Sequence, residues 1–352
     1  MSIFKRAVEE ELDFDDEEME EEDKEGGLRR RKIKDLKPEN KKKRKEPLKP
    51  WTKKERFLIL YVLVGSVFLA LILFASARGW KLPGLPKIKL PSFESKTIII
   101  TANKSDRTKA DKIVADFKDK TKNLSGEYTF YYIRLSDGFA FGTDEKEEMR
   151  AASLIKLPVF AALYREAEAG AINLDEKYTL KSTDKVAGSG SLYGKPAGTT
   201  LTYRELARYM GKESDNTAFN ILRKKLGDSK ITETINGLGM SKTSLSGNST
   251  SPYDIAIFFK KLWLNEIVSG QSRDEILGYL TDTIYESWLS KGISGVKVAH
   301  KYGSEVHVVN DAGIVLADKP FVLVVLTKGI IEKEANTVFP ELAKMIFEGQ
   351  KN

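Results

Sequence analysis

A serine and a lysine three residues apart, Ser153 and Lys156 in the run SLIK, are the first side chains in the sequence that could do chemistry together. We expect them near the start of a helix, where residues i and i+3 lie on one face and the lysine amine can reach the serine hydroxyl. A serine needs a base before it attacks an acyl group, and a desolvated lysine with a lowered pKa can be that base without a histidine. The positive end of the helix dipole would also favour an oxyanion there. The spacing therefore predicts a nucleophile with its own base, although one such pair also arises by chance.

A second polar run, Ser214-Asp215-Asn216, lies where we expect a connection between two helices. A loop serine can pass a proton to a leaving nitrogen, and the asparagine can hydrogen-bond a substrate amide. An isolated run of this kind is more often a helix cap or a turn. Beside the serine–lysine pair, it would supply the proton that the leaving group needs.

A third run, Lys301-Tyr302-Gly303 followed by Ser304, comes just before an expected strand. The lysine supplies a fixed positive charge, and the glycine lets a substrate lie close to the backbone because it has no side chain. A single KYG would most often be a turn. The three runs in this order make chance a poor explanation, and together they predict one site for acyl transfer.

The elements around these runs predict how they come together. Residues 97–352 should form one globular unit with strands at both ends, so that the two ends share one sheet and a helical lobe is inserted between them. The expected fold is α/β: an antiparallel sheet flanked by helices plus an inserted all-helical lobe, with the site in the cleft between the lobes. We expect helices at 107–122, 152–169, 202–210, 218–225, 252–264, 274–279 and 336–347, and strands at 127–134, 139–141, 305–310, 314–317 and 321–327.

Over about residues 105–350 the chain resembles the class A β-lactamases and penicillin-binding serine hydrolases, which carry the same three runs. The resemblance implies the β-lactamase/transpeptidase fold and needs no cofactor. The chain has no cysteine and only two histidines, so we also expect no metal site. The similarity extends beyond the runs to AASLIKLPVFAAL, GSGSL (188–192), SDNTAFNIL, TSPYDIA (250–256) and HKYGSEVHVVNDAGIV.

The resemblance implies a role for each residue of the three runs. Ser153 would be the acylated nucleophile and Lys156 its base or proton relay, while Ser214, helped by Lys301, would protonate the leaving nitrogen. The backbone N–H groups of Ser153 and Ser304 would form the oxyanion hole. Asn216 would hold the substrate side-chain amide. The substrate-binding residues would be Asn216, Tyr302, Gly303 and Ser304.

One departure from that family concerns release of the acyl group. Class A enzymes carry an omega-loop glutamate that activates the water for deacylation, but the loop Ser241–Ser249 (SKTSLSGNS) contains no carboxylate. Glu233 is the only glutamate between Asn216 and Pro252, and it lies in ITETINGLG, which resembles the helix before that loop. Deacylation should therefore be slow, with Lys156 as the remaining base.

A second departure is Tyr302, where the family usually has threonine or serine to bind the substrate carboxylate. The carboxylate would then sit differently or be bound by Ser304. Residues 305–318 contain no Arg or Lys, although antibiotic-hydrolysing members of the family often use one in this segment. His307 could take the place of that basic residue, but we expect it to be an ordinary strand histidine. Tyr193 either forms a wall of the cleft or simply packs.

The blocks before residue 97 predict a membrane anchor. From Glu9 to Asp23, 12 of 15 residues are Asp or Glu, and from Arg29 to Arg56 there are 15 Lys or Arg; such blocks usually stay disordered. The 21 residues FLILYVLVGSVFLALILFASA carry no charge, and as a helix they would span about 31 Å, close to a hydrocarbon core of about 30 Å. The basic excess before them would keep that side cytoplasmic. We expect a cytoplasmic tail (1–56), a transmembrane helix (57–77), a Pro-rich linker (78–96) and an exported domain (97–352) at the cell membrane.

Two other interpretations of these blocks are weaker. A cleaved signal peptide could end at Ala75-Ser76-Ala77, but the apolar run is longer than a typical signal core and begins only after 56 residues that are rich in charge. The basic block could bind nucleic acid, but topology explains it more simply, so we expect no nucleic-acid partner.

The sequence leaves three functions open. The first is a β-lactamase proper. The second is a D-alanyl-D-alanine carboxypeptidase or transpeptidase that acts on cell-wall peptides and is acylated by β-lactams. The third is a non-catalytic sensor of wall peptide or antibiotic, which would have no need for both Lys156 and Ser214. The partners expected are a β-lactam or D-alanyl peptide substrate, the membrane and peptidoglycan.

Overall fold

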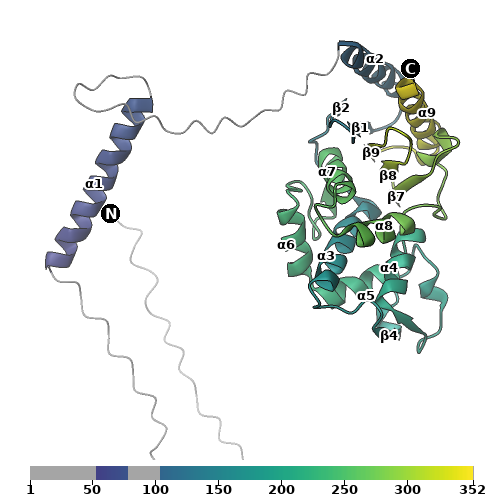
Figure 1. The fold of residues 1–352 in the computed structure, drawn as a ribbon, viewed down its shortest axis with the longest axis horizontal. Helices are drawn as coiled ribbons and strands as arrows, with labels where there is room; N and C mark the ends of the chain where they lie inside the picture. Colours follow the sequence, from purple (N-terminus) through teal and green to yellow (C-terminus); the bar gives the residue numbers. More distant parts are fainter. Residues whose placement is uncertain (1–52, 78–103, 352) are drawn as a thin grey trace, which may run out of the picture. The chain divides into compact units, whose positions relative to one another are not determined.

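The computed structural model describes residues 53–77 and 104–351 (Figure 1). The chain divides into two compact units, residues 1–92 and 93–352. In the first unit, helix α1 runs from Lys53 to Ala77, so it begins four residues before the expected start at Phe57 and ends where expected. The expected tail before Lys53 and the expected linker 78–96 lie outside the described residues.

Among the residues that the structure describes, no helix is long and apolar enough to cross a membrane. In α1 the described side chains are those of residues 53–54 and 57–67.

A five-stranded antiparallel sheet forms one half of the second unit, with the strand order β2-β1-β9-β8-β7. Strands from the two ends of the unit lie next to each other in it, as predicted, because β1 pairs with β9 from Glu127↔Lys328 to Arg134↔Phe321. The strands are β1 (Glu127–Arg134), β2 (Ala140–Thr143), β7 (Val298–Glu305), β8 (Val308–Val315) and β9 (Phe321–Lys328).

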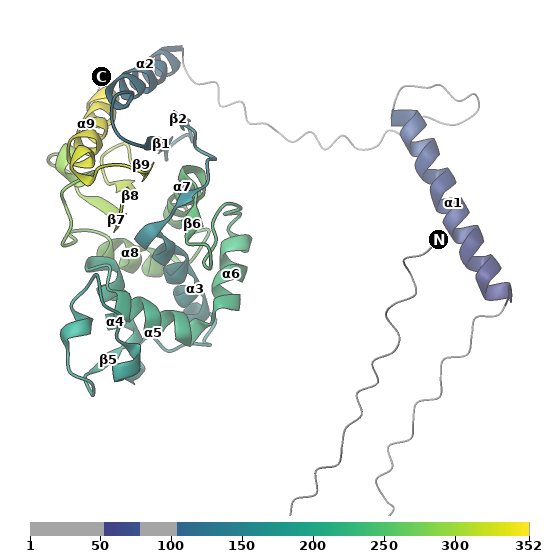
Figure 2. The ribbon, with the colours of Figure 1, turned by 180° about the vertical axis from the view of Figure 1, so that it is seen from behind.

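Helices cover both faces of this sheet (Figures 1 and 2). Helices α2 (Lys104–Thr121) and α9 (Glu332–Lys351) pack side by side over one face, and α7 (Pro252–Trp263) packs against the other. The central strand β9 is buried on both sides, because alternate residues of a strand point to opposite faces. Its side chains at 321, 323 and 325 join the core under α2 and α9, and those at 322, 324 and 326 join the core of the helical lobe.

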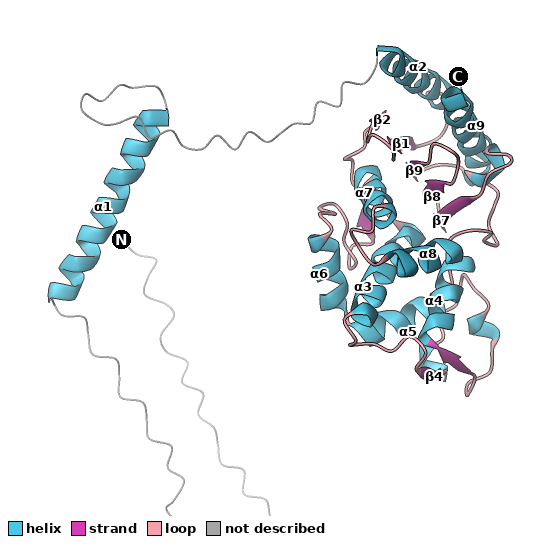
Figure 3. Ribbon diagram, viewed as in Figure 1, coloured by secondary structure: helices cyan, strands magenta, loops and turns pink. Residues whose placement is uncertain are grey.

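The helical lobe is inserted between β2 and β7, and Figure 3 shows it as mostly helix with short strands at its margins. The α/β fold with an antiparallel sheet and an inserted helical lobe is therefore confirmed for the described domain. The lobe contains the helices α3 (Leu157–Glu168), α4 (Tyr203–Lys212), α5 (Asn216–Leu226), α6 (Asp228–Gly237) and α8 (Gly270–Tyr279) and the 3-10 turns η2 (Ala152–Lys156), η3 (Ser182–Asp184) and η4 (Leu192–Gly194). Its strand pairs are β3 (Met149–Arg150) with β6 (Ser249–Thr250) and β4 (Lys177–Thr179) with β5 (Thr200–Thr202). A further 3-10 turn, η5 (Ser290–Gly292), packs against α9 instead.

The strand expected at 305–310 is wrong. Strand β7 ends at Glu305, Val306 and His307 make the turn, and β8 begins at Val308. Two valines flank the histidine in the sequence and imitate strand alternation, but Val306 is 84% exposed and His307 has a φ of +60°, which belongs to a turn. His307 is therefore a turn residue rather than an ordinary strand histidine, and its Nδ1 lies 3.2 Å from the carbonyl oxygen of Ile330.

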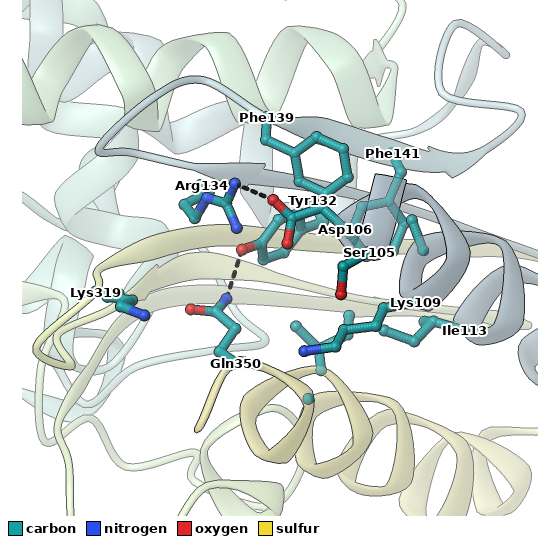
Figure 4. Close-up of a pocket in the computed structure, with 13 residues that line it drawn as sticks. Ser105, Asp106, Lys109, Ile113, Tyr132, Arg134, Phe139, Phe141, Lys319 and Gln350 are labelled. Atoms are coloured by element: carbon teal, nitrogen blue, oxygen red, sulfur yellow. Dashed lines mark hydrogen bonds and ion pairs between the residues drawn. The ribbon is translucent and has the colours of Figure 1, made fainter. Parts of the chain in front are cut away.

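A hollow of about 240 Å³ lies between the start of α2, strands β1 and β2, and the end of α9 (Figure 4). Arg134 donates to Asp106 at 2.8 Å and lies 5.0 Å from the Phe139 ring centroid, and the Gln350 side chain donates to the Tyr132 hydroxyl at 2.5 Å. These contacts tie the first and last helices of the unit to the sheet. The lining of this hollow includes none of the residues predicted to do chemistry.

Candidate active site

The nucleophile pair lies on the 3-10 turn η2, with α3 beginning at Leu157, so the α-helix expected from Ala152 begins five residues later. In a 3-10 turn residues i and i+3 nearly eclipse each other, which brings the two side chains even closer than an α-helix would. The Lys156 amine lies 3.1 Å from the Ser153 hydroxyl oxygen. Pro158 sits in the first turn of α3, where its missing N–H costs no helical hydrogen bond.

Two sheet residues hold this turn in place. The Asn310 side chain on β8 donates to the carbonyl oxygens of Arg150 at 2.7 Å and Ala151 at 3.2 Å. At Gly303 on β7, an added Cβ would lie 2.7 Å from the Ser153 nitrogen, so only glycine lets the strand approach this closely. Gly303 was expected to let a substrate lie close to the backbone, whereas the structure places it against the nucleophile turn. Asn310 was not predicted, because a single asparagine in a strand carries no pattern.

The Lys156 amine is buried among oxygen acceptors from two of the runs. Besides Ser153, it lies 2.5 Å from the Ser214 carbonyl, 3.1 Å from the Ser214 hydroxyl and 2.8 Å from the Asn216 side-chain oxygen. Burial lowers the pKa of Lys156 to about 7, against the opposing effect of the Asp215 carboxylate. A lysine with this pKa is largely neutral near pH 8 and can take the proton of the serine.

Ser214 connects the two buried lysines. Its hydroxyl oxygen lies 2.8 Å from the Lys301 amine and 3.1 Å from the Lys156 amine. Burial and the charge of Lys156 lower the pKa of Lys301 well below its usual range. Ser214 has a φ of +53°, an unfavourable conformation for a residue with a side chain. This geometry suits a hydroxyl that relays a proton.

The connection between α4 and α5 is fixed by a carboxylate for which the sequence analysis proposed no role. Asp215 caps α5 by accepting the Ala218 N–H at 2.8 Å, and it also accepts the Leu192 N–H at 2.8 Å. The next residue, Asn216, donates one amide hydrogen to the Ala187 carbonyl at 3.0 Å. An amide nitrogen carries a second hydrogen that can also donate.

The backbone of β7 presents Ser304 to the nucleophile turn. Strand β7 is an edge of the sheet, and the His300 N–H points away from β8, because it donates to the Leu280 carbonyl at 2.7 Å. The N–H groups of residues two apart in a strand point the same way, so the Ser304 N–H also points outward from the sheet edge. The contact between Gly303 and Ser153 brings this edge beside the nucleophile. This orientation agrees with the predicted oxyanion hole at the N–H groups of Ser153 and Ser304.

Tyr302 turns its hydroxyl toward the start of the second run. The phenol donates to the Glu213 carbonyl at 3.2 Å and lies 3.3 Å from the Ser189 hydroxyl. Its ring stacks on Tyr285 with centroids 3.7 Å apart. The hydroxyl is thus already engaged by the protein.

The loop 241–249 contains no carboxylate. Thr243 and Leu245 are its buried residues, and Thr243 is held by the buried carboxylate of Asp254 at 2.9 Å. Glu233 lies on α6 with a side chain that is 73% exposed and pairs with Lys230. The carboxylates of Asp254 and Glu233 therefore both lie outside the loop 241–249. Among the described residues no group of histidine, aspartate and glutamate side chains could hold a metal ion.

Residues 109–350 match the family model described as "Beta-lactamase enzyme family". The chain belongs to this family. It is a serine hydrolase of the β-lactamase type, and the residues in the nucleophile turn and its surroundings are its candidate catalytic groups. Among curated proteins, none matches the chain.

Solved structures show the same fold. PBP-A is 24% identical over 69% of this chain and 96% of its own, with a TM-score of 0.65. A β-lactamase from Sphaerobacter thermophilus is 24% identical over 70% of this chain and 97% of its own, with a TM-score of 0.64. A mutant of PBP-A, solved as an acyl-enzyme complex with penicillin G, is 23% identical over 70% of this chain and 97% of its own, with a TM-score of 0.64.

Proposed function

We propose that this enzyme is acylated at Ser153 by D-alanyl wall peptides or β-lactams and releases the acyl group slowly. One observation carries the proposal: the groups for acylation are assembled, while the loop that would supply a base for deacylation buries Leu245 and has no carboxylate. Acylation and release therefore differ in the groups available to them.

In the acylation step, neutral Lys156 takes the proton of Ser153 while the serine oxygen attacks the acyl carbon. The N–H groups of Ser153 and Ser304 receive the negative charge on the acyl oxygen. As the carbon–nitrogen bond breaks, Ser214 gives its proton to the leaving nitrogen and regains one from the lysine pair. The product is an ester on Ser153 and an amine, which leaves when the substrate is a peptide and stays attached to the acyl group when it is a β-lactam; Asn216 holds the acyl amide.

A transpeptidase is favoured over a β-lactamase proper by the same loop. Both reactions need acylation, but hydrolysis of the ester, by a β-lactamase or by a D-alanyl-D-alanine carboxypeptidase, also needs a base that activates water, whereas a transpeptidase passes the acyl group to an amine. The mutant of PBP-A that was captured with penicillin G as an acyl-enzyme is a precedent for such an ester on this fold. A non-catalytic sensor is the weakest alternative, because it would not need two buried lysines around one serine.

We also propose that the domain is held outside the cell by residues 57–77, next to the peptidoglycan. The support is in the sequence, where a basic block precedes 21 uncharged residues and a proline-containing stretch follows them. Protease added to intact cells should remove the domain and leave the tail. Digestion of the tail with the domain intact would contradict this topology.

Attachment and release of a labelled penicillin test the enzymatic proposal. The purified chain should take up label in one-to-one stoichiometry and keep it for minutes or longer after the free penicillin is removed. Rapid turnover of nitrocefin without accumulation of an adduct would show that another group activates the water, and that the enzyme is a β-lactamase.

A further inference from the structure

We propose that Arg150 and Glu305 are positioning residues for the oxyanion hole, because their ion pair holds its two N–H groups at the spacing that acylation requires. The inference deepens the proposed function and rests on acylation at Ser153. We assign neither residue a contact with substrate, since each acts through the backbone segment that carries one of the N–H groups, Ser153 or Ser304.

The two N–H groups of the proposed hole belong to distant parts of the chain. Ser153 lies on the turn η2, which follows β3, and Ser304 lies near the end of β7. Strand β7 is the last strand of the described sheet, so β8 pairs with one of its sides and the other side is an open edge. The spacing of the two N–H groups therefore depends on contacts between the end of β7 and the segment around η2, in addition to the pairing within the sheet.

Gly303 limits this spacing from one direction. An added Cβ there would lie 2.7 Å from the Ser153 nitrogen, so the strand is already as close to the turn as its backbone allows. Such a steric contact stops the strand from moving closer, but it does not stop the strand from moving away. Residues two apart in a strand point to the same face, so the Glu305 side chain points to the face on which Gly303 meets the turn.

The ion pair between Arg150 and Glu305 supplies the opposite restraint. The Nε of Arg150 donates to the Glu305 carboxylate at 2.7 Å. Arg150 stands three residues before Ser153, and Glu305 directly follows Ser304. The attraction therefore joins the two segments next to the two N–H groups and keeps the end of β7 from moving away from the turn.

Hydrogen bonds on the Arg150 side pass this restraint to the nucleophile turn. The Arg150 carbonyl accepts from the Asn310 side chain at 2.7 Å, and the next residue, Ala151, donates its N–H to the Asn248 carbonyl at 2.8 Å. The Asn248 side chain in turn donates to the Glu305 carboxylate at 3.0 Å. The end of β7, the segment before η2 and the loop 241–249 are thus joined by one network.

This network should affect catalysis more than stability. The side chains of Arg150 and Glu305 are 47% and 38% exposed, and ion pairs this exposed add little to the free energy of unfolding. Catalysis responds more strongly to position, because a misplacement of about 1 Å in a catalytic group can cost about 10²-fold in rate. A displaced β7 would leave the Ser304 N–H poorly aligned with the acyl oxygen.

A purely electrostatic role for the pair predicts the opposite sign for one of the two residues. A carboxylate near the hole disfavours a developing oxyanion, so Glu305→Gln would speed acylation if only its charge mattered. Positioning predicts slower acylation in both Glu305→Gln and Arg150→Gln, because either substitution breaks the same contact. The direction of the Glu305→Gln effect therefore separates the two roles.

The rate of acylation by penicillin G, followed in the full-length chain by intact mass against time, tests the inference. We expect Glu305→Gln and Arg150→Gln each to slow acylation by about tenfold, which is less than the about 10²–10³-fold lost with an oxyanion-hole donor. The variant with both substitutions should be no slower than the slower single variant, because both remove one interaction. Arg150→Lys keeps the charge and should be faster than Arg150→Gln.

Glu341→Gln is the matched control for loss of an exposed ion pair. Glu341 pairs with Lys120 between α9 and α2, and the two side chains are 46% and 47% exposed. This variant should acylate at the unmodified rate.

The infrared band of the ester carbonyl on Ser153 provides a readout that a merely structural role would not move. Hydrogen bonds from the hole polarise the carbonyl and lower its stretching frequency. In Glu305→Gln and Arg150→Gln the band should move to higher frequency, whereas in Glu341→Gln it should stay in place. Denaturant midpoints of all variants should remain close to that of the unmodified chain.

Four results would overturn the inference: faster acylation in Glu305→Gln, losses that multiply when it is combined with Arg150→Gln, an ester band that does not move, or a large fall in the denaturant midpoint of either variant. The last result would make the pair a structural one. Failure of penicillin G to label Ser153 in the unmodified chain would instead overturn the proposed function.

Discussion

The amine of Lys156 lies 3.1 Å from the hydroxyl oxygen of Ser153, and both belong to one 3-10 turn. No histidine takes part in this contact, and we propose the lysine as the base. Its pKa, lowered to about 7 by burial, makes this possible near neutral pH.

Acylation should therefore depend on pH through Lys156. The amine is protonated below pH 7 and neutral above it, so the acylation rate should fall about tenfold per unit as the pH drops below about 7. Lys156→Arg keeps a positive charge but stays protonated, and it should lower the rate by about 10²–10⁴-fold at pH 8. The rate constant for labelling by penicillin between pH 5 and 9 checks this. A flat profile would exclude Lys156 as the base.

Leu245→Glu should speed release of the acyl group. Leu245 is the buried apolar residue of the 241–249 loop, so a glutamate there would put a carboxylate on the buried side of a loop that has none. Deacylation should rise by up to about 10²–10⁴-fold, the range of one general base. Leu245→Gln has the same size without a base and is the matched control. Equal release from both variants would mean that the effect came from loosening the loop.

Gly303→Ala should slow acylation and weaken the fold. The new methyl group would lie 2.7 Å from the Ser153 nitrogen, and backbone on both sides cannot yield without moving the nucleophile turn. Overpacking of this kind costs about 1–3 kcal/mol in the free energy of unfolding. Gly278→Ala on α8, where an added Cβ meets nothing within 4 Å, is the control and should keep its stability. Denaturant melts and labelling rates of both variants measure the difference, and similar losses in the two would contradict the packing argument.

His300 should stabilise the domain in a pH-dependent way. Burial alone would lower its pKa, but the charge and hydrogen bond of Asp311, with Glu286, raise that pKa to about 9. The imidazole nitrogens lie 2.7 Å from Asp311 and 3.2 Å from Glu286. Because the folded pKa lies above the ordinary 6.5, the stabilisation is fully present below about pH 6.5 and is lost as the pH rises through about 9.

Unfolding of His300→Gln tests this sign. At pH 6 the variant should be less stable than the unmodified domain by an amount on the order of 3 kcal/mol, the equivalent of the raised pKa. The gap should shrink between pH 6.5 and 9. His307→Gln, at the exposed turn, is the matched control for removal of a histidine whose recorded contact is a backbone carbonyl. A gap that is constant with pH would contradict the role of the His300 charge.

The site was largely predictable because its chemistry sits in short runs. Ser153, Lys156, Ser214, Asn216 and Lys301 were expected from spacing and order, and the structure brings their side chains within hydrogen-bond distance of one another. Strand β1 was predicted residue for residue, because EYTFYYIR combines aromatic and β-branched residues between turn signals.

What could not be predicted depends on contacts between distant segments. Asn310 on β8 holds the nucleophile turn through a hydrogen bond to Arg150, which lies 160 residues earlier in the chain. No local sequence pattern predicts a bond between residues so far apart. The β7–β8 turn was missed because Val306 imitates a strand residue while its side chain faces solvent. The 3-10 form of η2 follows from packing of the turn against β7, which helix propensity does not include.

The central claim is that Ser153 becomes acylated and that Lys156 activates it. Mass spectrometry of peptides from the chain after incubation with penicillin G tests this claim most directly. We expect one penicilloyl group on the peptide that contains Ser153, no adduct in Ser153→Ala, and formation slowed by about 10²–10⁴-fold in Lys156→Ala. An adduct on another residue, or one that persists in Ser153→Ala, would contradict the account.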